Sequence, residues 1–375
     1  MRALGVDPGT RSFDLCCIED DMDHVVLDES LASELVASDP AAVFKVIKEV
    51  QPDVIVGPSG YGLEFKHISK FTNADIALTT LDKIGDVEIP VLSGLRKLLW
   101  MMKDGKMNAY SLPGVVQLPT VPLHRKVNKI DMGTADKTCV AAYAIWDQAM
   151  KYGIDYNETN LISLEMGFGY NAAMIVEKGE IIDGIGGTIF PGPGYLTLSL
   201  MDGELAYFLG AFTKLKLFEG GASHIATFRG GAKVIELDEF VKGVQSRKEG
   251  YETAWLSMLE GVVKAVSMGI TDLKERPKEV ILTGRLSRVK TIFDGVKAEL
   301  SKKLNVEVRS PTRFTKKAKD AAQGAAIIAN GIEGGRYKPL TDRLRIKESK
   351  GTVLDNIYLP EFRAMEIVKK LKDRQ

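Results

Sequence analysis

A glycine-spaced turn between apolar strands, which occurs twice in the chain, constrains the fold more than any other feature. Residues 161–187 predict a buried strand, a tight turn at Gly167 and Gly169, and two further strands. In such a turn the backbone N–H groups are not covered by side chains, and they are natural ligands for phosphate oxygens. A plain β-meander is the alternative, because glycine alone indicates only a turn.

The beginning of the chain has the same pattern. Residues 3–6 predict a short strand that enters the turn Asp7-Pro8-Gly9-Thr10, and residues 13–18 and 25–27 predict two further strands. Each half then continues as helix, strand, helix, strand, helix. The later elements of the first half are expected at 40–50, 54–57, 93–102, 115–121 (extended) and 136–152, and those of the second half at 196–209, 237–244, 253–268, 279–282, 286–304, 306–308 and 320–332. This order predicts an α/β fold with two domains.

Composition narrows the function classes. Fifty basic and fifty acidic residues leave no charge excess that would favour nucleic acid or a membrane surface as partner. No window is apolar over the length of a bilayer span, and the first residues lack the apolar core of a signal peptide. The three cysteines and four histidines have no metal-ligand spacing. We therefore expect a cytoplasmic protein with no nucleic-acid or membrane partner.

The layout resembles the superfamily of acetate and sugar kinases, Hsp70 and actin. The segments that carry the resemblance are Gly5–Thr10 (first phosphate loop), Gly167–Gly169 (second phosphate loop), Thr283–Leu286 (adenosine loop), and the helices from Asp136 and from Asp320 with Gly324 (the two connecting helices). The resemblance implies two ribonuclease-H-like (actin-like ATPase) domains, each βββαβαβα with a mixed five-stranded sheet, and a nucleotide cleft between them.

The resemblance also divides the chain. Residues 1–157 are expected to form the N-terminal domain with the first phosphate loop. Residues 158–334 are expected to form the C-terminal domain with the second phosphate loop and the adenosine loop. Residues 335–375 are left as a tail with a helical pattern, which packs either on the N-terminal domain or on a partner subunit of a homodimer.

Within the superfamily the chain looks most like the acyl (carboxylate) kinases, and specifically like a mainly archaeal family described as probable butyrate kinases. The segment Asp183–Gly194 is similar to that family's segment after the second loop but lacks its arginine, and Glu165 stands where the family has histidine. The resemblance implies ATP-dependent phosphoryl transfer to a small carboxylate, with Mg²⁺, to give an acyl phosphate. The alternatives are an ATP-binding regulator or assembly factor, and, less favoured, a sugar kinase with Asp131 as base.

Six residues are candidates for the chemistry. Asp7, at a strand end before a glycine turn, is expected to hold Mg²⁺, although an Asx-turn explains the same residue. Arg11 would contact the β- and γ-phosphates or point into solvent. The histidine and cations expected to supply the missing positive charge and to anchor the carboxylate are His124, Arg125 and Lys137, with solvated loop charges as the alternative. Glu165, at the end of its strand, would face the metal if it lines the cleft.

The residues expected to bind the nucleotide lie in the glycine turns. Gly284 would admit the adenosine closely and Arg285 would stack on the purine, unless this turn only begins a helix. The full predicted set is Gly5, Gly9, Thr10, Ser12, Gly167, Phe168, Gly169, Thr283, Gly284, Arg285 and Gly324.

Overall fold

The computed structural model describes residues 1–57 and 59–373, apart from the side chains of residues 22 and 23. The first half contains β1 (Arg2–Pro8), β2 (Ser12–Glu19), β3 (Asp21–Ala32), α1 (Ser33–Ser38), α2 (Pro40–Val50), β4 (Val54–Val56), α3 (Asn73–Thr80), α4 (Pro90–Asp104), β5 (Ala109–Tyr110), α5 (Leu123–Lys126) and α6 (Ala135–Tyr152). The second half contains β6 (Leu161–Met166), β7 (Asn171–Glu177), β8 (Glu180–Ile185), α7 (Gly203–Leu209), α8 (Ala222–Thr227), α9 (Leu237–Gln245), α10 (Tyr251–Asp272), β9 (Glu279–Thr283), α11 (Lys290–Leu304), β10 (Val308–Arg309), α12 (Asp320–Ile332), α13 (Lys338–Arg343) and α14 (Ala364–Val368).

Two five-stranded sheets share one strand order. The first sheet runs β3-β2-β1-β4-β5, and the second runs β8-β7-β6-β9-β10, so the third, second, first, fourth and fifth strands of each half are neighbours. In the first sheet, β1 is antiparallel to β2 and parallel to β4. In the second, β6 is parallel to β9. The predicted α/β fold with two mixed sheets and the order βββαβαβα is confirmed.

The chain divides into two compact units that do not follow the two halves of the sequence. Unit 1 consists of residues 1–159, 176–184 and 312–375, and unit 2 consists of residues 160–175 and 185–311. Unit 1 therefore contains the first sheet together with α6 and α12. Unit 2 contains β6, β9 and β10 and the helices α7 to α11.

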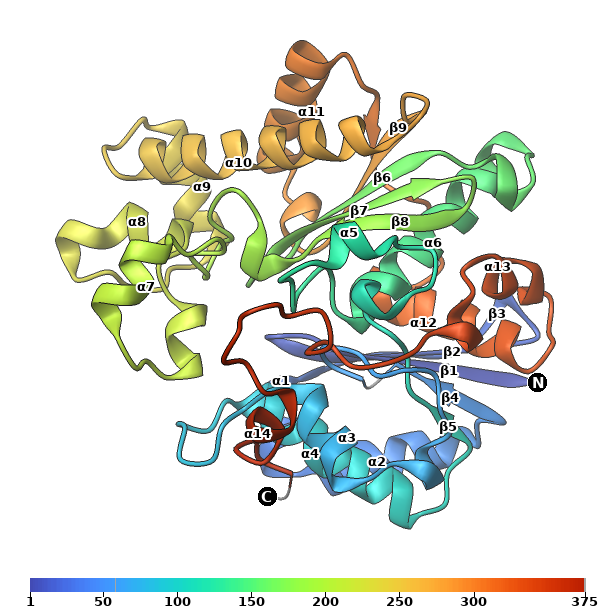
Figure 1. Ribbon diagram of the computed structural model, residues 1–375. Coiled ribbons are helices and arrows are strands. Elements are labelled where there is room, and N and C mark those ends of the chain that lie inside the picture. The colour runs from blue at the N-terminus through green and yellow to red at the C-terminus, as the bar shows by residue number, and fades with distance from the viewer. Residues whose placement is uncertain (58, 374–375) are drawn as a thin grey trace. The chain divides into compact units, whose positions relative to one another are not determined.

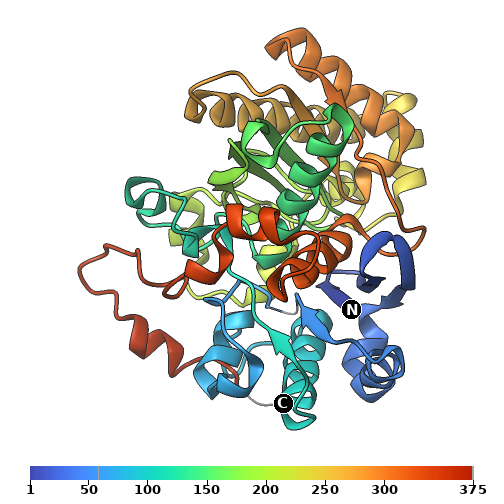
Figure 2. The ribbon, with the colours of Figure 1, turned by 90° about the vertical axis from the view of Figure 1, so that its right-hand side faces the viewer.

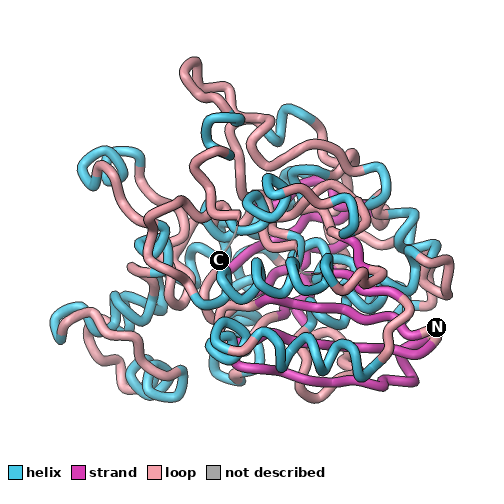
Figure 3. The backbone as a smooth tube through the Cα atoms, turned by 90° about the horizontal axis from the view of Figure 1, so that it is seen from below, coloured by secondary structure: helices cyan, strands magenta, loops and turns pink. Residues whose placement is uncertain are grey.

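In unit 1, α12 lies against β1 and α6 at close range (Figure 1). All thirteen of its residues are buried, because alanine, glycine and isoleucine dominate its sequence. A Cβ at Gly324 would overlap the carbonyl oxygen of Cys139 in α6, and a Cβ at Gly5 in β1 would overlap the carbonyl oxygen of Ala322. Both glycines are therefore required by backbone packing. The helices α1 to α4 lie on the other side of this sheet (Figure 1), and a view from below shows helices lying over strands (Figure 3).

One expected element of the first half is wrong. The apolar residues 115–121 predicted an extended segment, but Val115–Gln117 form a 3-10 turn. The side-chain oxygen of Gln117 accepts a hydrogen bond from the backbone N–H of Gly114 at 2.8 Å, and its amide nitrogen donates to the carbonyl of Gly62 at 3.2 Å. The local hydrogen bond to Gly114 and the tertiary one to Gly62 override the strand propensity of the valines.

In unit 2, one expected helix is shorter than predicted. The apolar pattern from 196 to 209 gives a helix only from Gly203, because the side chain of Asp202 accepts hydrogen bonds from the backbone N–H groups of Glu204 and Leu205 at 2.9 and 3.3 Å and so caps the helix there. The residues before the cap continue in irregular structure.

The C-terminal segment packs on the N-terminal part of unit 1 (Figure 2). The indole Nε1 of Trp100 in α4 donates to the carbonyl of Asp373 at 2.8 Å. The ammonium of Lys372 lies 3.4 Å from Asp82, which also forms a fully buried ion pair with Arg96 at 3.1 Å. The tail thus covers a charge that would otherwise lie buried with one partner.

Two further observations concern the state of the cysteines and the length of the helices. Cys16, Cys17 and Cys139 are free thiols, and all three are buried. Within residues 1–57 and 59–373, none of the helices combines the length and the apolar composition that a bilayer crossing requires.

Candidate active site

Two aspartates face each other across the hairpin formed by β1 and β2. Asp7 and Asp14 are direct partners in the antiparallel register, so their side chains lie on the same face of the sheet. They are 4% and 0% exposed. Like charges placed opposite each other repel, so this buried pair needs a cation. Lys319, the residue before α12, supplies it: its Nζ lies 3.1 Å from Oδ2 of Asp7 and 2.9 Å from Oδ2 of Asp14.

Helix α6 adds a third carboxylate and a second ammonium. Asp136, in the first turn of the helix, lies 2.6 Å from Nζ of Lys137 and accepts a hydrogen bond from the hydroxyl of Thr134. Both charges act on Asp7, since Asp136 raises and Lys137 lowers its pKa. We call Asp7, Asp14, Asp136, Lys137 and Lys319 the carboxylate cluster. It holds three carboxylates and two ammonium groups, so negative charge is in excess by one.

The carboxylate cluster has spare acceptor capacity. Among the described residues, Oδ1 of Asp7 and Oδ1 of Asp14 are buried without a hydrogen-bond partner. The other oxygen of Asp14 accepts from the Ser12 hydroxyl at 2.9 Å and from Lys319. Buried carboxylate oxygens normally have partners, so two unpartnered ones beside each other indicate a place for a cationic or hydrogen-bonding ligand.

The charges of the carboxylate cluster are strongly perturbed. Burial raises the pKa of Asp7 from 3.8 to about 7, because the single ammonium of Lys319 is shared with Asp14 and does not offset the loss of water. Burial alone would lower the pKa of Lys319, but Asp7 and Asp14 outweigh it and raise that pKa. Burial alone would likewise raise the pKa of Asp136, but Lys137, together with the Thr134 hydroxyl and Lys319, outweighs it and lowers that pKa.

Two local features position Lys319. The Asp28 carboxylate in β3 accepts hydrogen bonds from the backbone N–H groups of residues 316–318 at 2.7 to 3.1 Å and fixes the loop before α12. The ammonium of Lys319 lies directly against Gly9, in the space that a Cβ at this position would enter. The glycine of the first turn thus makes space for a cation of the same chain.

We expect the raised pKa of Asp7 to be visible in the pH dependence of stability. A carboxyl with a higher pKa in the folded state stabilises the fold fully below its unfolded pKa, near 3.8, and this contribution is lost as the pH rises through about 7. The free energy of unfolding of the wild type, relative to that of Asp7→Asn, should therefore fall by more than about 1 kcal/mol between pH 5 and pH 8. Urea titrations at both pH values measure this difference, and parallel behaviour of the two proteins would contradict it.

In unit 2, the second glycine turn and the predicted adenosine turn lie side by side. Strands β6 and β9 are parallel partners, with Glu165 opposite Thr283. The Gly167 N–H donates to the Tyr170 carbonyl at 2.9 Å and closes the turn after β6. A Cβ at Gly284, which has φ +87°, would overlap the carbonyl oxygen of Met166. The Gly284 position thus requires glycine for its backbone conformation and for its close approach to β6.

The side chains of these two turns also meet. The Arg285 guanidinium lies 5.8 Å from the centre of the Phe168 ring, and that ring packs on Tyr195 with the centroids 4.9 Å apart. The carbonyl of Gly169 accepts a hydrogen bond from the Thr197 hydroxyl at 3.0 Å. Unit 2 therefore brings together Glu165, Gly167, Phe168, Gly169, Thr283, Gly284 and Arg285.

The remaining predicted residues lie in several places of unit 1. His124 is exposed on the short helix α5. Arg125 is turned toward β8, where it donates to the carbonyl of Ile182 at 2.9 Å and lies 3.9 Å from the Asp183 carboxylate. Arg125 therefore reaches the first residue of the segment that lacks the family's arginine. Thr10 and Arg11 belong to the turn between β1 and β2.

Four residues of the cluster region were not predicted from the sequence: Asp14, Asp28, Asp136 and Lys319. A hairpin drawn through the first glycine turn with Asp7 paired to Asp14 would have revealed the aspartate pair, and with it the need for a cation. Nothing in the sequence points to Lys319, which is one of several lysines in residues 316–319.

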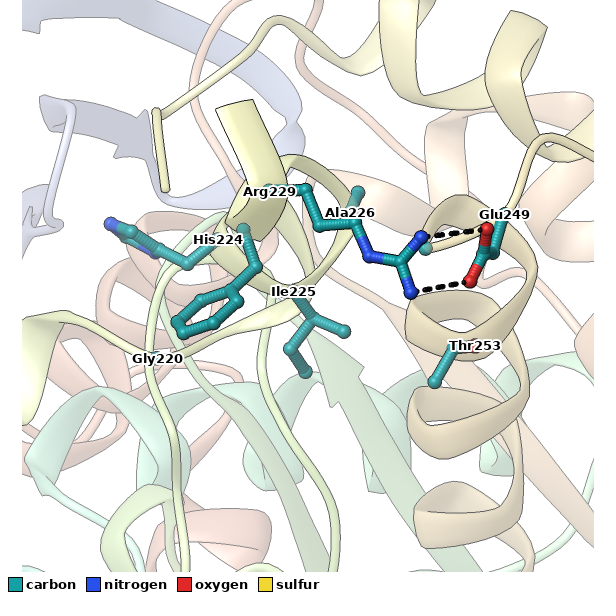
Figure 4. Close-up of a pocket in the computed structure, with 9 residues that line it drawn as sticks. Gly220, His224, Ile225, Ala226, Arg229, Glu249 and Thr253 are labelled. Atoms are coloured by element: carbon teal, nitrogen blue, oxygen red, sulfur yellow. Dashed lines mark hydrogen bonds and ion pairs between the residues drawn. The ribbon is translucent and has the colours of Figure 1, made fainter. Parts of the chain in front are cut away.

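A further pocket of about 490 Å³ lies in unit 2, and its lining residues are Gly220, His224, Ile225, Ala226, Phe228, Arg229, Glu249, Gly250 and Thr253. Arg229 and Glu249 form an ion pair on one side of it at 2.9 Å, and the imidazole of His224 lies toward the other side (Figure 4). None of the residues predicted from the sequence lines this pocket.

The described residues fit Mg²⁺ in one specific way. In the part of the chain that the structure describes, no group of three or more His, Cys, Asp or Glu side chains is arranged to hold a metal ion. Mg²⁺ bound with a nucleotide needs only one or two carboxylates beside phosphate oxygens and waters. Asp7 and Asp14, with their unpartnered oxygens, match that smaller requirement.

Solved structures of kinases are similar to this chain. A propionate kinase from Francisella tularensis is 12% identical with a TM-score of 0.61 over 86% of this chain and 98% of its own. An acetate kinase from Porphyromonas gingivalis is 13% identical with a TM-score of 0.58 over 87% and 98%. An acetate kinase from Entamoeba histolytica is 11% identical with a TM-score of 0.56 over 80% and 86%. At these identities the likeness shows the fold alone, which is the two-domain actin-like ATPase fold.

Sequence comparison adds the family. No curated protein matches the chain significantly. One family model matches residues 5–359 and so covers both glycine turns, the adenosine turn and all residues of the carboxylate cluster. Membership of the butyrate-kinase-like family stays a prediction. Because the match spans most of the 375 residues, the chain belongs to the family described as "Protein of unknown function (DUF1464)".

Proposed function

We propose that this chain transfers the γ-phosphoryl group of ATP to a small carboxylate and so forms an acyl phosphate. The observation that carries the proposal is the carboxylate cluster beside the first glycine turn, with its excess negative charge and two unpartnered carboxylate oxygens. Phosphoryl transfer needs donors around the phosphates, a divalent cation that neutralises them, and aligned reactants. The fold shared with propionate and acetate kinases supports the same reaction class.

Each part of the carboxylate cluster has a task in this proposal. Asp7 and Asp14 would hold Mg²⁺, which would neutralise charge on the β- and γ-phosphates. Asp136 fixes the ammonium of Lys137 at 2.6 Å, so that this cation is held in place and does not sample solvent. The N–H groups of the first glycine turn, around Gly9, face the phosphate oxygens.

Within unit 2, two adjacent turns are proposed to contact nucleotide. The N–H groups of the turn at Gly167 and Gly169 are donors for phosphate oxygens, and Glu165 stands beside them at the end of β6. The turn at Gly284 exposes backbone to the adenosine. Arg285, held over the Phe168 ring, offers the flat face of its guanidinium to the purine.

The acceptor chemistry needs no protein base. A carboxylate is ionised at neutral pH, so one of its oxygens attacks the γ-phosphorus, the bond from that phosphorus to the β–γ bridging oxygen breaks, and ADP leaves with the electron pair. No proton has to be removed. A hydroxyl acceptor would need a base, and Asp131, the candidate for that role, is 7% exposed and accepts the Gly133 N–H at 3.1 Å. This engagement favours the carboxylate acceptor.

A carboxylate beside a γ-phosphate needs positive charge near it. In this proposal Arg125 supplies it, because its guanidinium already lies 3.9 Å from Asp183, the first residue of the segment that lacks the family's arginine. His124 is the second candidate. Pairing of two copies into a homodimer and a cytoplasmic location remain predictions from the sequence.

Hydroxylamine trapping tests the function. We expect one member of a panel from acetate to hexanoate, branched chains included, to give a hydroxamate that depends on both ATP and Mg²⁺. Asp7→Asn, assayed in parallel, should give none, which excludes a contaminating kinase. If no carboxylate gives a hydroxamate while the wild type still binds Mg·ATP, the proposal fails and an ATP-dependent regulator on the same fold becomes the better interpretation.

A further inference from the structure

We propose that Lys319 is a built-in cation of the carboxylate cluster: it keeps Asp7 and Asp14 together and is displaced from them when a divalent cation binds. The inference rests on the proposed function only in naming Mg²⁺ as that cation. It goes beyond that function because it assigns to a lysine of this chain the role of a competitor at the metal site.

The Lys319 ammonium bridges the two aspartates. One ammonium lies 3.1 Å from Asp7 and 2.9 Å from Asp14, so it bridges the two side chains that are direct partners across the hairpin. A divalent cation held by both aspartates would need the place that the ammonium now fills. The lysine and the metal therefore compete for one place.

The carboxylate cluster contains more carboxylates than ammonium groups. With Lys319 in place and all three carboxylates ionised, the carboxylate cluster has three negative and two positive charges, and Oδ1 of Asp7 and Oδ1 of Asp14 stay without partners among the described residues. One ammonium thus leaves this site short of both charge and hydrogen bonds. A divalent cation supplies the missing charge and can reach the unused oxygens. The exchange is electrostatically favourable for the carboxylates and so favours displacement of the lysine.

The backbone next to Lys319 is held in place by hydrogen bonds. The loop with Lys319 is fixed by the hydrogen bonds from residues 316–318 to Asp28, and Gly9 leaves the space that the ammonium fills. Lys319 directly precedes α12, so its backbone is held in place. The four rotatable bonds of its side chain allow the ammonium to move. Displacement therefore requires only rotation of one side chain. The released ammonium stays next to the first glycine turn, where phosphate oxygens are expected.

Divalent-cation binding without nucleotide tests the inference. We expect Lys319→Met to bind Mn²⁺, used as a paramagnetic probe for Mg²⁺, at least about tenfold more tightly than the wild type, because a competing charge within about 4 Å has been removed. Electron paramagnetic resonance of the free Mn²⁺ measures the affinity. Lys317→Met is the matched control, since Lys317 lies in the same loop but pairs with Glu29 at 2.9 Å, and it should leave the affinity unchanged.

A second pair of variants covers the case in which Lys319→Met does not fold. In Asp14→Asn/Lys319→Met one charge of each sign is lost, so the aspartate pair no longer repels. This double variant should bind Mn²⁺ more tightly than Asp14→Asn alone. Equal or weaker Mn²⁺ binding after loss of the lysine, in either background, overturns the inference. The hydroxamate assay is separate: a tighter Mn²⁺ site without hydroxamate rejects the proposed acceptor and leaves the lysine's role intact.

Discussion

Asp7→Asn should weaken binding of Mg·ATP at least about 100-fold at pH 8, because attraction between a carboxylate and a cation at contact is worth about 4 kcal/mol near a protein surface. Asparagine keeps the shape of the side chain and removes the charge, so the hairpin and the hydrogen-bonding geometry are preserved. Binding of ATP in the presence of EDTA should change little, since Asp7 acts through the metal. Calorimetry with Mg²⁺ and with EDTA separates the two effects.

Asp131→Asn is the matched control for this prediction. It also changes a buried aspartate of unit 1 to its neutral isostere, and asparagine can still accept the Gly133 N–H. Mg·ATP binding should be unchanged in this variant. If Asp7→Asn retains the gain in affinity that Mg²⁺ gives the wild type, Asp7 does not hold the metal.

Gly324→Ala should destabilise the fold by about 3 kcal/mol, at the upper end of the usual effect of overpacking a tight core. The added Cβ would overlap the carbonyl oxygen of Cys139, and this atom belongs to the backbone of α6, so it cannot rotate away. The two helices would have to separate along a contact in which every residue of α12 is buried. Urea or thermal denaturation of the variant measures the loss.

Gly203→Ala is the control, because a Cβ at this position in the first turn of α7 meets nothing within 4 Å. It should be neutral or stabilising by up to about 0.5 kcal/mol. The comparison also separates two roles for Gly324. If Gly324→Ala is as stable as the wild type but no longer binds ATP, the glycine serves the nucleotide, as the sequence analysis expected, and the packing explanation fails.

The order of the elements was predictable because it rests on local signals. Each glycine turn follows a short apolar run, and the cap at Asp39 with Pro40 begins α2 as predicted, with the Asp39 side chain accepting the Ala42 N–H at 3.1 Å. The turn at residues 115–117 was mispredicted because its conformation depends on two hydrogen bonds of Gln117. The partner Gly62 is far away in the sequence, and the hydrogen bond to Gly114 does not follow from the pattern of apolar residues.

The candidate site was predicted only where its residues sit in turns. Asp7 stands at a strand end before glycine, and that context points to chemistry. Asp14 lies inside an apolar strand, and its importance follows only from the register that pairs it with Asp7. Lys319 comes more than three hundred residues later, in a lysine-rich loop that resembles any solvated surface. Its place between two aspartates depends on Asp28 and on α12, and therefore on the tertiary fold.

The three buried thiols have a practical consequence for spectroscopy. Burial raises the pKa of Cys17 to about 12 and those of Cys16 and Cys139 well above their ordinary value, and it also shields the three thiols, so we expect them to react poorly with maleimide reagents at neutral pH. The natural chain therefore needs no cysteine removal before labelling. A single cysteine in place of the exposed Lys317 would carry a fluorophore or spin label two residues from Lys319, and movement of that loop could be followed in an otherwise unaltered protein.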